Sequence, residues 1–431
     1  MPTTSRGKTA CTHILWTTTI AACSFAQAAN AEDANRSFTR AGDHTIACYY
    51  FPNYHVDPRN EKQHGPGWSE WELVRRAEPK FEGHQQPKIP LWGYTDEADP
   101  AVMAKKIDAA ASHGIDAFIF DWYWYDDGPF LERGLEKGFL HAPNNARLKF
   151  AVMWANHDWV DIHPAKAGYV PLQYPGKVTP ETFDRITDHV IRTYFRHPSH
   201  WMIDGKPYFS VYELFRLVEG FGGIDATAKA LQRFREKTKA AGFPGLHLNA
   251  VAAGIQILPG EKDVKNPAEL VSRLGFDSVT SYVWVHHVGF PTFPTTPYTF
   301  MMDKAAEHWA KATAEFRIPY HPNVTMGWDP SPRTVQSDKF ANQGYPFMAT
   351  LSGNTPAAFK TALTRAKAFL DNHAETQKIL TINAWNEWTE GSYLEPDTIH
   401  GMAYLEAIRD VFGLRASYQP QRGLGSGRTG D

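Results

Sequence analysis

Two glutamates near the end of the chain are the residues best placed to do chemistry. Glu387 and Glu390 lie three positions apart in the segment 382–397, which reads INAWNEWTEGSYLEPD. A pair of carboxylates can divide acid–base work, because one can hold a proton while the other is ionised. Trp385 precedes the pair and Trp388 lies between its two members, and aromatic rings stack on the apolar faces of sugar rings. The combination indicates a site that cleaves glycosidic bonds.

The same segment has a plainer interpretation, in which it is a loop whose tryptophans pack and whose glutamates are solvated. The residues before it, Lys378 to Ile382, form a short apolar run that is typical of a buried strand. A strand that ends in carboxylates, an amide and large aromatic rings is uncommon among packing loops. We therefore favour the functional interpretation.

Eight segments of the chain have the composition of buried strands, and segments with helical spacing of apolar residues alternate with them. Three of the helices begin at Asp99-Pro100, Thr179-Pro180 and Thr355-Pro356, where a capping residue precedes a proline. This alternation predicts an α/β fold, a single-domain (β/α)8 TIM barrel. The predicted strands are Thr45–Phe51, Ala117–Trp122, Lys149–Trp154, Tyr208–Tyr212, His247–Val251, Ser278–Val283, Tyr320–Met326 and Ile379–Ala384, and further helices are predicted over 226–241, 298–316 and 402–412.

In such a barrel the functional groups collect where the strands end, because those ends open on one face. Acidic, amide, imidazole and indole side chains follow several predicted strands here, which predicts a polar cleft with aromatic walls. The run Trp122-Tyr123-Trp124-Tyr125 is expected to be half core and half cleft, since side chains alternate along a strand. Besides the catalytic candidates Glu387 and Glu390, the predicted substrate-binding residues are Tyr50, Tyr54, Trp68, Glu70, Asp121, Trp122, Trp124, Trp154, Asn156, His157, Asp158, Tyr212, Tyr282, Trp284, Trp328, Asp329, Trp385, Asn386 and Trp388.

Other chemistries find no support in the sequence. No GxSxG elbow, P-loop or GxGxxG follows a predicted strand, which speaks against acyl transfer and against nucleotide or dinucleotide chemistry. His286 and His287 are adjacent, so on an extended chain their side chains point to opposite sides, and no HExxH spacing accompanies them. Asp126-Asp127-Gly128 is typical of a turn, since further calcium ligands are missing. We predict neither a metal nor a cofactor.

Composition narrows the range of partners. The chain has 431 residues, a net charge of −3 and no basic run, which argues against a nucleic-acid partner. No stretch of about 18 apolar residues occurs, so no transmembrane segment is predicted. The 14 tryptophans suit both a core and a carbohydrate-facing cleft. The expected partner is a polysaccharide or oligosaccharide, and the sequence does not predict an oligomeric state.

The N-terminal residues 1–31 are typical of an export signal. Arg6 and Lys8 supply positive charge, the following residues are mostly apolar or small, and the alanines at 26–31 offer small-x-small cleavage sites. The alternative is a lipoprotein signal in Ile20-Ala21-Ala22-Cys23, in which Cys23 would carry the lipid. We therefore expect an exported protein, periplasmic or extracellular.

The remaining boundaries follow from composition. The catalytic domain is expected over 40–414, and the polar, glycine-rich residues 415–431 are expected to be a disordered tail. Cys48 would be the single cysteine left after cleavage of the signal, and its apolar neighbours predict a buried, inert thiol.

Several longer motifs of the chain resemble one known family. The resemblance covers about residues 45–412 and is to the WbsX-like group related to glycoside hydrolase family 99. The motifs are Tyr49-Tyr50-Phe51-Pro52, Gly67-Trp68-Ser69-Glu70-Trp71, Pro79-x-Phe81-x-Gly83-His84-x-Gln86-Pro87, Gly114-Ile115-Asp116-Ala117-Phe118, Trp154-Ala155-Asn156 and Ala384-Trp385-Asn386-Glu387-Trp388-x-Glu390-Gly391.

The resemblance implies a (β/α)8 barrel that acts on glycans. In family 99 the matching glutamates cleave endo-α-mannosidic bonds with retention and without a metal. Carried over to this sequence, Glu387 would assist attack by the 2-hydroxyl of the sugar, and Glu390 would be the general acid and base. Members of the WbsX-like group are also often described as glycosyltransferases, from their genetic context.

One departure from the family bears on specificity. Where relatives often read Trp-Ala-Asn-Glu, this chain has Trp154-Ala155-Asn156-His157, so an imidazole stands in place of an expected carboxylate and mannose is not assumed. We predict an exported glycoside hydrolase, endo-acting and retaining. The alternatives are a glycosyltransferase of cell-surface polysaccharide synthesis and a non-catalytic glycan-binding barrel.

Overall fold

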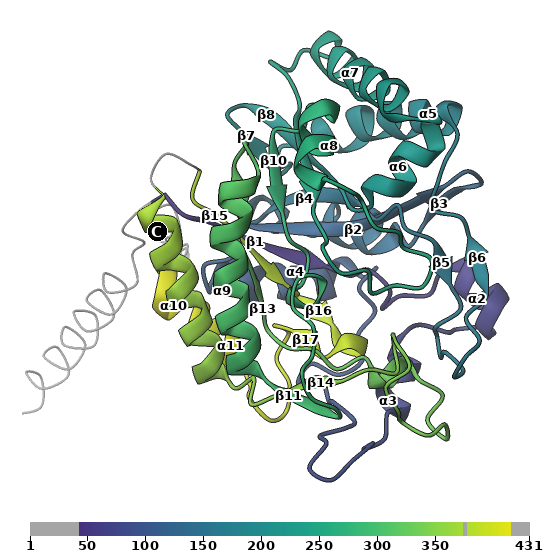
Figure 1. The fold of residues 1–431 in the computed structure, drawn as a ribbon, viewed down its shortest axis with the longest axis vertical. Coiled ribbons are helices and arrows are strands. Elements are labelled where there is room, and N and C mark those ends of the chain that lie inside the picture. The colour runs from purple at the N-terminus through teal and green to yellow at the C-terminus, as the bar shows by residue number, and fades with distance from the viewer. Residues whose placement is uncertain (1–42, 374–376, 415–431) are drawn as a thin grey trace, which may run out of the picture.

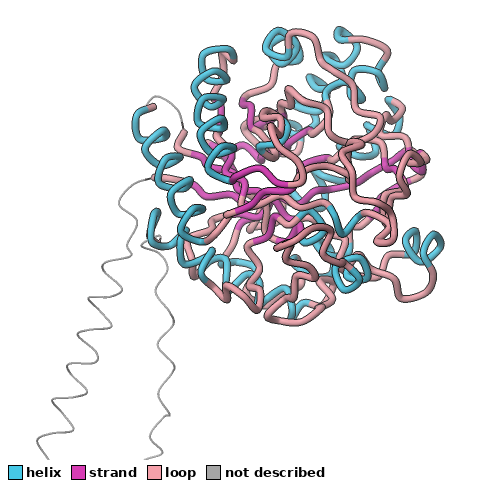
Figure 2. The backbone as a smooth tube through the Cα atoms, turned by 60° about the horizontal axis from the view of Figure 1, so that its bottom comes forward, coloured by secondary structure: helices cyan, strands magenta, loops and turns pink. Residues whose placement is uncertain are grey.

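A ring of parallel strands lies at the centre of the protein, with helices packed around it (Figures 1 and 2). The structure is a computed structural model that describes residues 43–373 and 377–414. The strands of the ring are hydrogen-bonded in the order β12-β10-β9-β8-β4-β2-β1-β15-β13. Their bounds are β1 Thr45–Tyr50, β2 Ala117–Tyr125, β4 Lys149–Trp154, β8 Lys206–Val211, β9 His247–Val251, β10 Ser278–Thr280, β12 Tyr320–His321, β13 Asn323–Thr325 and β15 Ile379–Asn383.

The two ends of this ladder meet at the seventh strand position. β12 pairs with β10 and β13 pairs with β15, and the two short strands are separated by a single residue, Pro322. Proline has no backbone N–H to donate, so the hydrogen-bond ladder is interrupted at this residue although the chain continues in the same direction. β15 in turn pairs with β1 in parallel. The predicted (β/α)8 barrel in a single domain is therefore confirmed, and each predicted strand has its counterpart among the described residues.

The predicted helix starts are also confirmed. Asp99, Thr179 and Thr355 each accept a backbone N–H at the start of a helix whose first residue is proline. Figure 1 shows α9, α10 and α11 on one side of the barrel and α5 to α8 together on another. The helices are α2 Pro58–His64, α3 Trp71–Arg76, α4 Pro100–Ala111, α5 Pro180–Val190, α6 Leu214–Phe221, α7 Ile224–Ala240, α8 Pro267–Leu274, α9 Tyr298–Glu315, α10 Pro356–Asn372 and α11 Ala403–Phe412.

Short elements decorate the loops that leave the barrel. Two small sheets, β5 with β6 and β16 with β17, follow the third and eighth strand positions and carry residues of the predicted site. The short strands are β3 Gly128–Phe130, β5 Trp159–Val160, β6 Leu172–Tyr174, β7 Met202–Ile203, β11 Thr295–Pro297, β14 Thr350–Ser352, β16 Asn386–Glu387 and β17 Ser392–Tyr393, and the short helical turns are η1 Gly134–Phe139, η2 Asn145–Arg147, η3 Ile191–Phe195, η4 Trp284–His286, η5 Ser331–Arg333 and η6 Trp388–Glu390.

The long segment between β1 and α4 lies against the loop that follows β13. Lys80 Nζ donates to the carbonyl of Gln336 at 2.8 Å, and the Glu78 N–H donates to the side chain of Gln336 at 2.9 Å. His84 Nε2 lies 2.8 Å from Asp329 Oδ2. These contacts fix the segment beside the carboxyl ends of the strands, where the predicted site lies.

Cys48 on β1 has no exposed surface, and burial raises the pKa of its thiol well above the ordinary value. The export signal, the lipid site at Cys23 and the tail over 415–431 all fall outside the described residues. Within the described residues, none of the helices combines the length and the apolar character needed to cross a membrane.

Candidate active site

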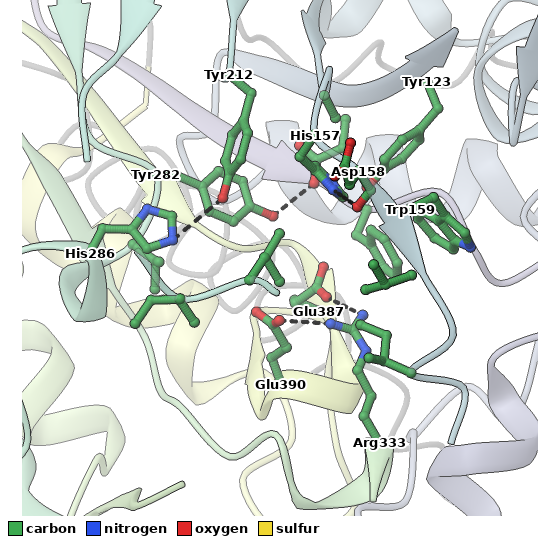
Figure 3. A pocket seen from close by; sticks show the side chains of 18 of the residues that line it. Tyr123, His157, Asp158, Trp159, Tyr212, Tyr282, His286, Arg333, Glu387 and Glu390 are labelled. Carbon is green, nitrogen blue, oxygen red and sulfur yellow. Dashed lines mark hydrogen bonds and ion pairs between the residues drawn. The ribbon is translucent and has the colours of Figure 1, made fainter. Parts of the chain in front are cut away.

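A pocket opens at the carboxyl ends of the barrel strands and encloses about 650 Å³ of empty space, part of it open to solvent (Figure 3). Its lining comes from segments that follow nearly every strand position, as expected for a barrel of this kind. The lining residues are Phe51, Asp121, Tyr123, Met153, Ala155, His157, Asp158, Trp159, Val160, Ile162, His163, Tyr212, Ile257, Leu258, Tyr282, Val283, His286, Trp328, Arg333, Glu387 and Glu390.

The buried guanidinium of Arg333 organises the acidic side of this pocket. Its Nη2 lies 2.7 Å from Glu387 Oε1 and its Nη1 lies 2.7 Å from Glu390 Oε1 (Figure 3). Its Nε lies 2.8 Å from Glu70 Oε1. Each nitrogen of the fork therefore binds a different carboxylate, which holds Glu387 and Glu390 side by side at the pocket wall.

Arg333 is held in place by the turn η5 and by aromatic contacts. Asp329 Oδ1 accepts the N–H of Ser331 at 3.2 Å at the start of the turn, and the Asp329 N–H donates to the carbonyl of Glu390. The guanidinium lies 5.1 Å from the ring centroid of Phe51. The loop after β13 and the loop after β15 are thus joined directly, and the positions of Arg333 and Glu390 depend on each other.

Gly391 explains why the two loops can approach so closely. Its φ is +63°, and a Cβ on it would lie 2.7 Å from the Cβ of Asp329. A left-handed residue in such a tight space must be glycine. The glycine that follows Glu390 in the sequence motif therefore has a structural reason.

Burial and Arg333 act in opposite directions on the acidic groups. Burial raises the pKa of Glu387 well above its ordinary value, and the nearby Glu390 adds to the effect while Arg333 opposes it. The pKa of Glu390 is raised as well, chiefly by burial, with Arg333 and a hydrogen bond from Tyr345 opposing it. At Glu70 burial is outweighed by Arg333, His163 and hydrogen bonds, so its pKa is lowered.

A third acid, Asp121 on β2, lies across the pocket. Tyr282 Oη donates to Asp121 Oδ2 at 2.7 Å, whereas Oδ1 is buried and has no hydrogen-bond partner within the described residues. Burial raises the pKa of Asp121 well above its ordinary value, and the charge of Glu390 acts in the same direction. Glu387 Oε2 is likewise buried and without a partner in the described part of the chain. These oxygens are free to accept donors from a ligand.

Three histidines line the pocket as uncharged rings at neutral pH. Burial lowers the pKa of His157 to about 4 and those of His163 and His286 to about 3. The rings of His163 and Trp159 are stacked at 5.0 Å between centroids, with 7° between their planes. Neutral imidazoles and indoles of this kind offer flat surfaces and single hydrogen-bonding atoms to a sugar.

Eight of the residues predicted from the sequence line this one pocket: Glu387, Glu390, Asp121, His157, Asp158, Tyr212, Tyr282 and Trp328. Asp158 is already committed to the protein, because it accepts the N–H of Gly176 at 2.8 Å and Arg216 Nη2 at 2.5 Å. It is therefore better described as a wall residue than as a free ligand group.

Most of the tryptophans predicted to bind substrate do not line the pocket. Trp122 donates to Tyr194 Oη at 3.1 Å, and Trp154 packs against Phe183 of α5. Neither lines the pocket, nor does the adjacent Trp124. Their strand neighbours Asp121 and Met153 do line it, because alternate side chains point to opposite faces of the sheet.

The tryptophans of the glutamate motif are also core residues. Trp385 Nε1 donates to Glu395 Oε1 at 3.0 Å and Trp388 Nε1 donates to Glu395 Oε2 at 2.7 Å. Lys106 completes this buried cluster, at 2.7 Å from Glu395. Buried indole N–H groups need an acceptor, and Glu395 supplies it. Neither tryptophan lines the pocket, so contact between either of them and a substrate stays a prediction.

The other predicted binding residues that lie outside the pocket hold the loops around it. They do so through the following contacts: Trp284 donates to the carbonyl of Asn323 at 2.9 Å, Trp68 stacks on His64, Tyr50 donates to Glu97 at 2.8 Å, Tyr54 Oη accepts the N–H of Thr389 at 3.4 Å, Asn156 binds the backbone of Glu213, Asn386 binds the backbone of Phe51, Asp329 binds His84 and Gln86, and Glu70 binds Arg333. None of these residues lines the pocket, and each contacts other parts of the protein, so contact between any of them and a substrate stays a prediction.

Sequence reasoning missed several residues of the site. Arg333 lies in a loop with no motif, and Tyr345, which donates to Glu390 Oε1 at 2.6 Å, follows it in the same long connection. Tyr123, Trp159 and His163 also line the pocket, although none of them is among the predicted substrate-binding residues. The sequence could have identified Tyr123, because side chains alternate along a strand and Tyr123 shares a face with Asp121, two positions earlier.

No group of three or more histidine, cysteine, aspartate or glutamate side chains within the described residues is arranged to hold a metal ion. The Arg333 guanidinium occupies the centre of the carboxylate cluster. What the arrangement can do is acid–base chemistry between two linked carboxylates in a pocket with aromatic walls.

Comparison with known sequences settles the family. Residues 46–408 match the family described as glycosyltransferase WbsX. The chain belongs to the WbsX family. The uncharacterized WxcX proteins of two strains of Xanthomonas campestris pv. campestris, B100 and ATCC 33913, are each 27% identical over 369 residues, which is 85% of this chain. The chain spans about half the length of these curated relatives, with 49% of each covered.

Solved structures similar to this WbsX-family chain are barrels of the glycoside hydrolase type. A glycoside hydrolase-like protein aligns with a TM-score of 0.55 at 15% identity, covering 88% of this chain and 96% of that one. The GH99 endo-alpha-mannosidase from Bacteroides thetaiotaomicron, in complex with bis-tris-propane, aligns with a TM-score of 0.50 at 14% identity, covering 85% and 95%. At these identities the likeness concerns the fold.

Proposed function

We propose that the chain is an exported glycoside hydrolase whose acid–base pair is Glu387 and Glu390. The observation that carries the proposal is the attachment of both carboxylates to the single guanidinium of Arg333, at the wall of a pocket with aromatic rings. The fold supports an enzyme of the glycoside hydrolase type, and the N-terminal signal pattern supports export. Retention and endo action are parts of the proposal that rest on the resemblance to family 99.

The reaction needs one group that donates a proton to the departing oxygen and one that acts as a base. Two like charges bound so close together cannot both ionise freely, so the pair divides these roles. Glu390 Oε1 receives hydrogen bonds from both Arg333 and Tyr345, which stabilise its ionised form. Glu387 has Arg333 alone on Oε1 and no described partner on Oε2.

This asymmetry favours Glu387 as the group that holds the proton before a substrate binds. Burial raises the pKa of Glu387 well above its ordinary value, whereas Tyr345 opposes the rise at Glu390. The family resemblance implies the opposite division, with Glu390 as the acid. We propose Glu387 as the proton donor, and the two assignments predict different kinetics.

The first test is hydrolysis itself. The purified protein is incubated with a panel of polysaccharides, and new reducing ends are counted. Glu387→Gln and Glu390→Gln should each lower turnover by about 10²–10⁴-fold, while the exposed Glu307→Gln, whose side chain is 64% exposed, should leave it unchanged. If both variants cleave at the wild-type rate, the pair is not catalytic. If the wild type releases no ends but binds a glycan, the barrel is a binding protein.

The second test assigns the roles. Aryl glycosides of the sugar found in the panel are compared with phenol leaving groups of different acidity. A variant that lacks the proton donor should recover activity on the best leaving group, because that group departs without protonation. Recovery by Glu387→Gln and not by Glu390→Gln supports our assignment. The reverse result supports the division implied by family 99.

The family description favours a second candidate, a glycosyltransferase. Such an enzyme would take its sugar from an activated donor, so a nucleotide sugar should raise its thermal unfolding temperature. A hydrolase should respond to glycans and not to nucleotide sugars. Measuring the unfolding temperature with a set of nucleotide sugars therefore separates the two candidates.

A further inference from the structure

The charges that face the pocket limit the sugars it can take. Arg333 is the only lysine or arginine among the described residues that line it. Its Nε, Nη1 and Nη2 are bound to Glu70, Glu390 and Glu387. A carboxylate, phosphate or sulfate on a sugar that reached the guanidinium would meet a cation whose charge is already shared by three carboxylates.

The histidines do not replace the missing positive charge. His157 Nδ1 lies 2.9 Å from the carbonyl of Asp158, and His286 Nε2 lies 3.4 Å from Tyr212 Oη. Burial outweighs the charge of Asp158, which favours protonation of His157, and so lowers the pKa of that ring. His163 has Glu70 at 3.6 Å, but Arg333 and His64 oppose its protonation. Burial keeps the pKa of all three rings at about 3 or 4, so they are uncharged at neutral pH.

The remaining polar atoms of the wall are acceptors and weak donors. Asp121 Oδ1 and Glu387 Oε2 are buried carboxyl oxygens without partners among the described residues. Trp328 Nε1 is a buried donor that also lacks a partner in the described part of the chain. Hydroxyl groups suit this set, because each can donate to a carboxyl oxygen and accept from an indole. An anionic group would find no unpaired cation, and it would face the negative charge that remains when Glu70 and Glu390 share the single positive charge of Arg333 in a site of low dielectric.

We propose that the subsite between Asp121 and Glu387 takes an uncharged sugar, or one that bears an amine, and excludes uronic acids and phosphorylated or sulfated sugars. The inference rests on the proposed function, since it specifies the sugar beside the proposed acid–base pair. It would restrict the substrates to neutral or amino-sugar segments of a polysaccharide, even where the polymer carries acidic residues elsewhere.

Three small polyols of similar shape test the charge preference without any turnover. At pH 7 and constant ionic strength, the full chain is titrated with tris(hydroxymethyl)aminomethane, which is a cation, with uncharged 1,1,1-tris(hydroxymethyl)ethane, and with anionic 2,2-bis(hydroxymethyl)propionate. Saturation-transfer NMR gives the dissociation constants. We expect the anion to bind at least about tenfold more weakly than the uncharged triol, a difference of about 1.4 kcal/mol. Equal binding of the anion would overturn the proposal.

Variants place the effect in the pocket. Asp121→Asn replaces an unpaired carboxyl oxygen with an amide, which can offer an N–H to an anion, so the dissociation constants of the anion and the triol should move closer together. Asp188 lies on the surface of α5 with a side chain that is 61% exposed, so Asp188→Asn should leave the ratio of the two dissociation constants unchanged. If the two variants behave alike, the charge preference does not arise at Asp121 and the inference fails.

A second comparison uses the proposed reaction. An acidic polysaccharide is offered before and after its carboxyl groups are reduced to alcohols, and cleavage of the reduced polymer alone is the expected result. Cleavage at uronic acids in the native polymer would overturn the charge inference while leaving the hydrolase proposal intact. If no polymer is cleaved, the hydrolase proposal fails, and the polyol titration still decides the charge preference.

Discussion

Replacing Arg333 with methionine tests the central feature of the site, a buried cation shared by three acids. The Arg333 side chain is 5% exposed, and those of Glu70, Glu387 and Glu390 are 0%, 3% and 7% exposed. Methionine keeps much of the volume but removes the counter-charge. Breaking a buried ion pair by removing one partner costs about 3–5 kcal/mol, because the other charge is left unpaired. We expect Arg333→Met to lose about that much free energy of unfolding at pH 7.

The free energy of unfolding that Arg333→Met loses should depend on pH, because the variant changes the pKa of the buried acids. In the wild type the pKa of Glu70 is lowered from 4.5, so this group stabilises the fold above that value and the stabilisation is lost on acidification. Without Arg333, burial dominates and the pKa of Glu70 becomes raised. A raised pKa makes the fold most stable at low pH, with stability lost as pH rises. The difference in free energy of unfolding between wild type and variant should therefore increase as the pH rises from about 4.5.

Urea unfolding at pH 5 and at pH 7.5 measures this difference. A matched control is Arg273→Met, which breaks an exposed pair with Asp225 at 2.9 Å and should cost about 0–1 kcal/mol at both pH values. A loss at Arg333 that is equal at the two pH values would mean that packing, not charge, explains its effect. A loss below about 1 kcal/mol would refute the claim that it neutralises buried acids.

Two further substitutions test the surroundings of Glu390. Tyr345→Phe removes a donor at 2.6 Å, so the pKa of Glu390 should rise and the acidic limb of the pH–rate profile should move to higher pH; an unmoved limb would contradict the ionised role of Glu390. Gly391→Ala places a Cβ 2.7 Å from Asp329 at a φ of +63° and should cost about 3 kcal/mol in urea unfolding. Gly353→Ala, at +75° with open space around it, should cost about 1–2 kcal/mol, and equal losses would remove the steric argument.

The parts of the fold that sequence could predict are those governed by local rules. Apolar runs mark the buried strands, and a capping residue before a proline marks the start of α4, α5 and α10. The seventh strand was predicted as one segment, and Pro322 divides it into β12 and β13. Helices α6 and α8 were not predicted, since each is only 8 residues long.

The site itself was predictable only where it follows a strand end. Arg333 binds Glu70, Glu390 and Glu387, which are 263, 57 and 54 positions away in the chain. No local pattern specifies such a contact, because it exists only once three loops have folded together. Most of the predicted tryptophans lie outside the pocket for a different reason, which is local. Trp122 and Trp154 do follow the strand rule, but they lie on the faces that pack against the outer helices.

The transferase description of the family and the hydrolase-like fold are compatible in chemical terms. A base that activates water for attack on a sugar can equally activate a sugar hydroxyl, so the acceptor decides between hydrolysis and transfer. The chemistry of the sugar donor restricts the possible reactions more strongly than that of the acceptor. A nucleotide sugar carries a diphosphate that needs cations or backbone N–H groups, and Arg333, the only lysine or arginine among the described pocket residues, is bound by carboxylates. Transfer by this chain would therefore use a glycan as donor and depend on Glu387 and Glu390, so that loss of either removes transfer and hydrolysis together.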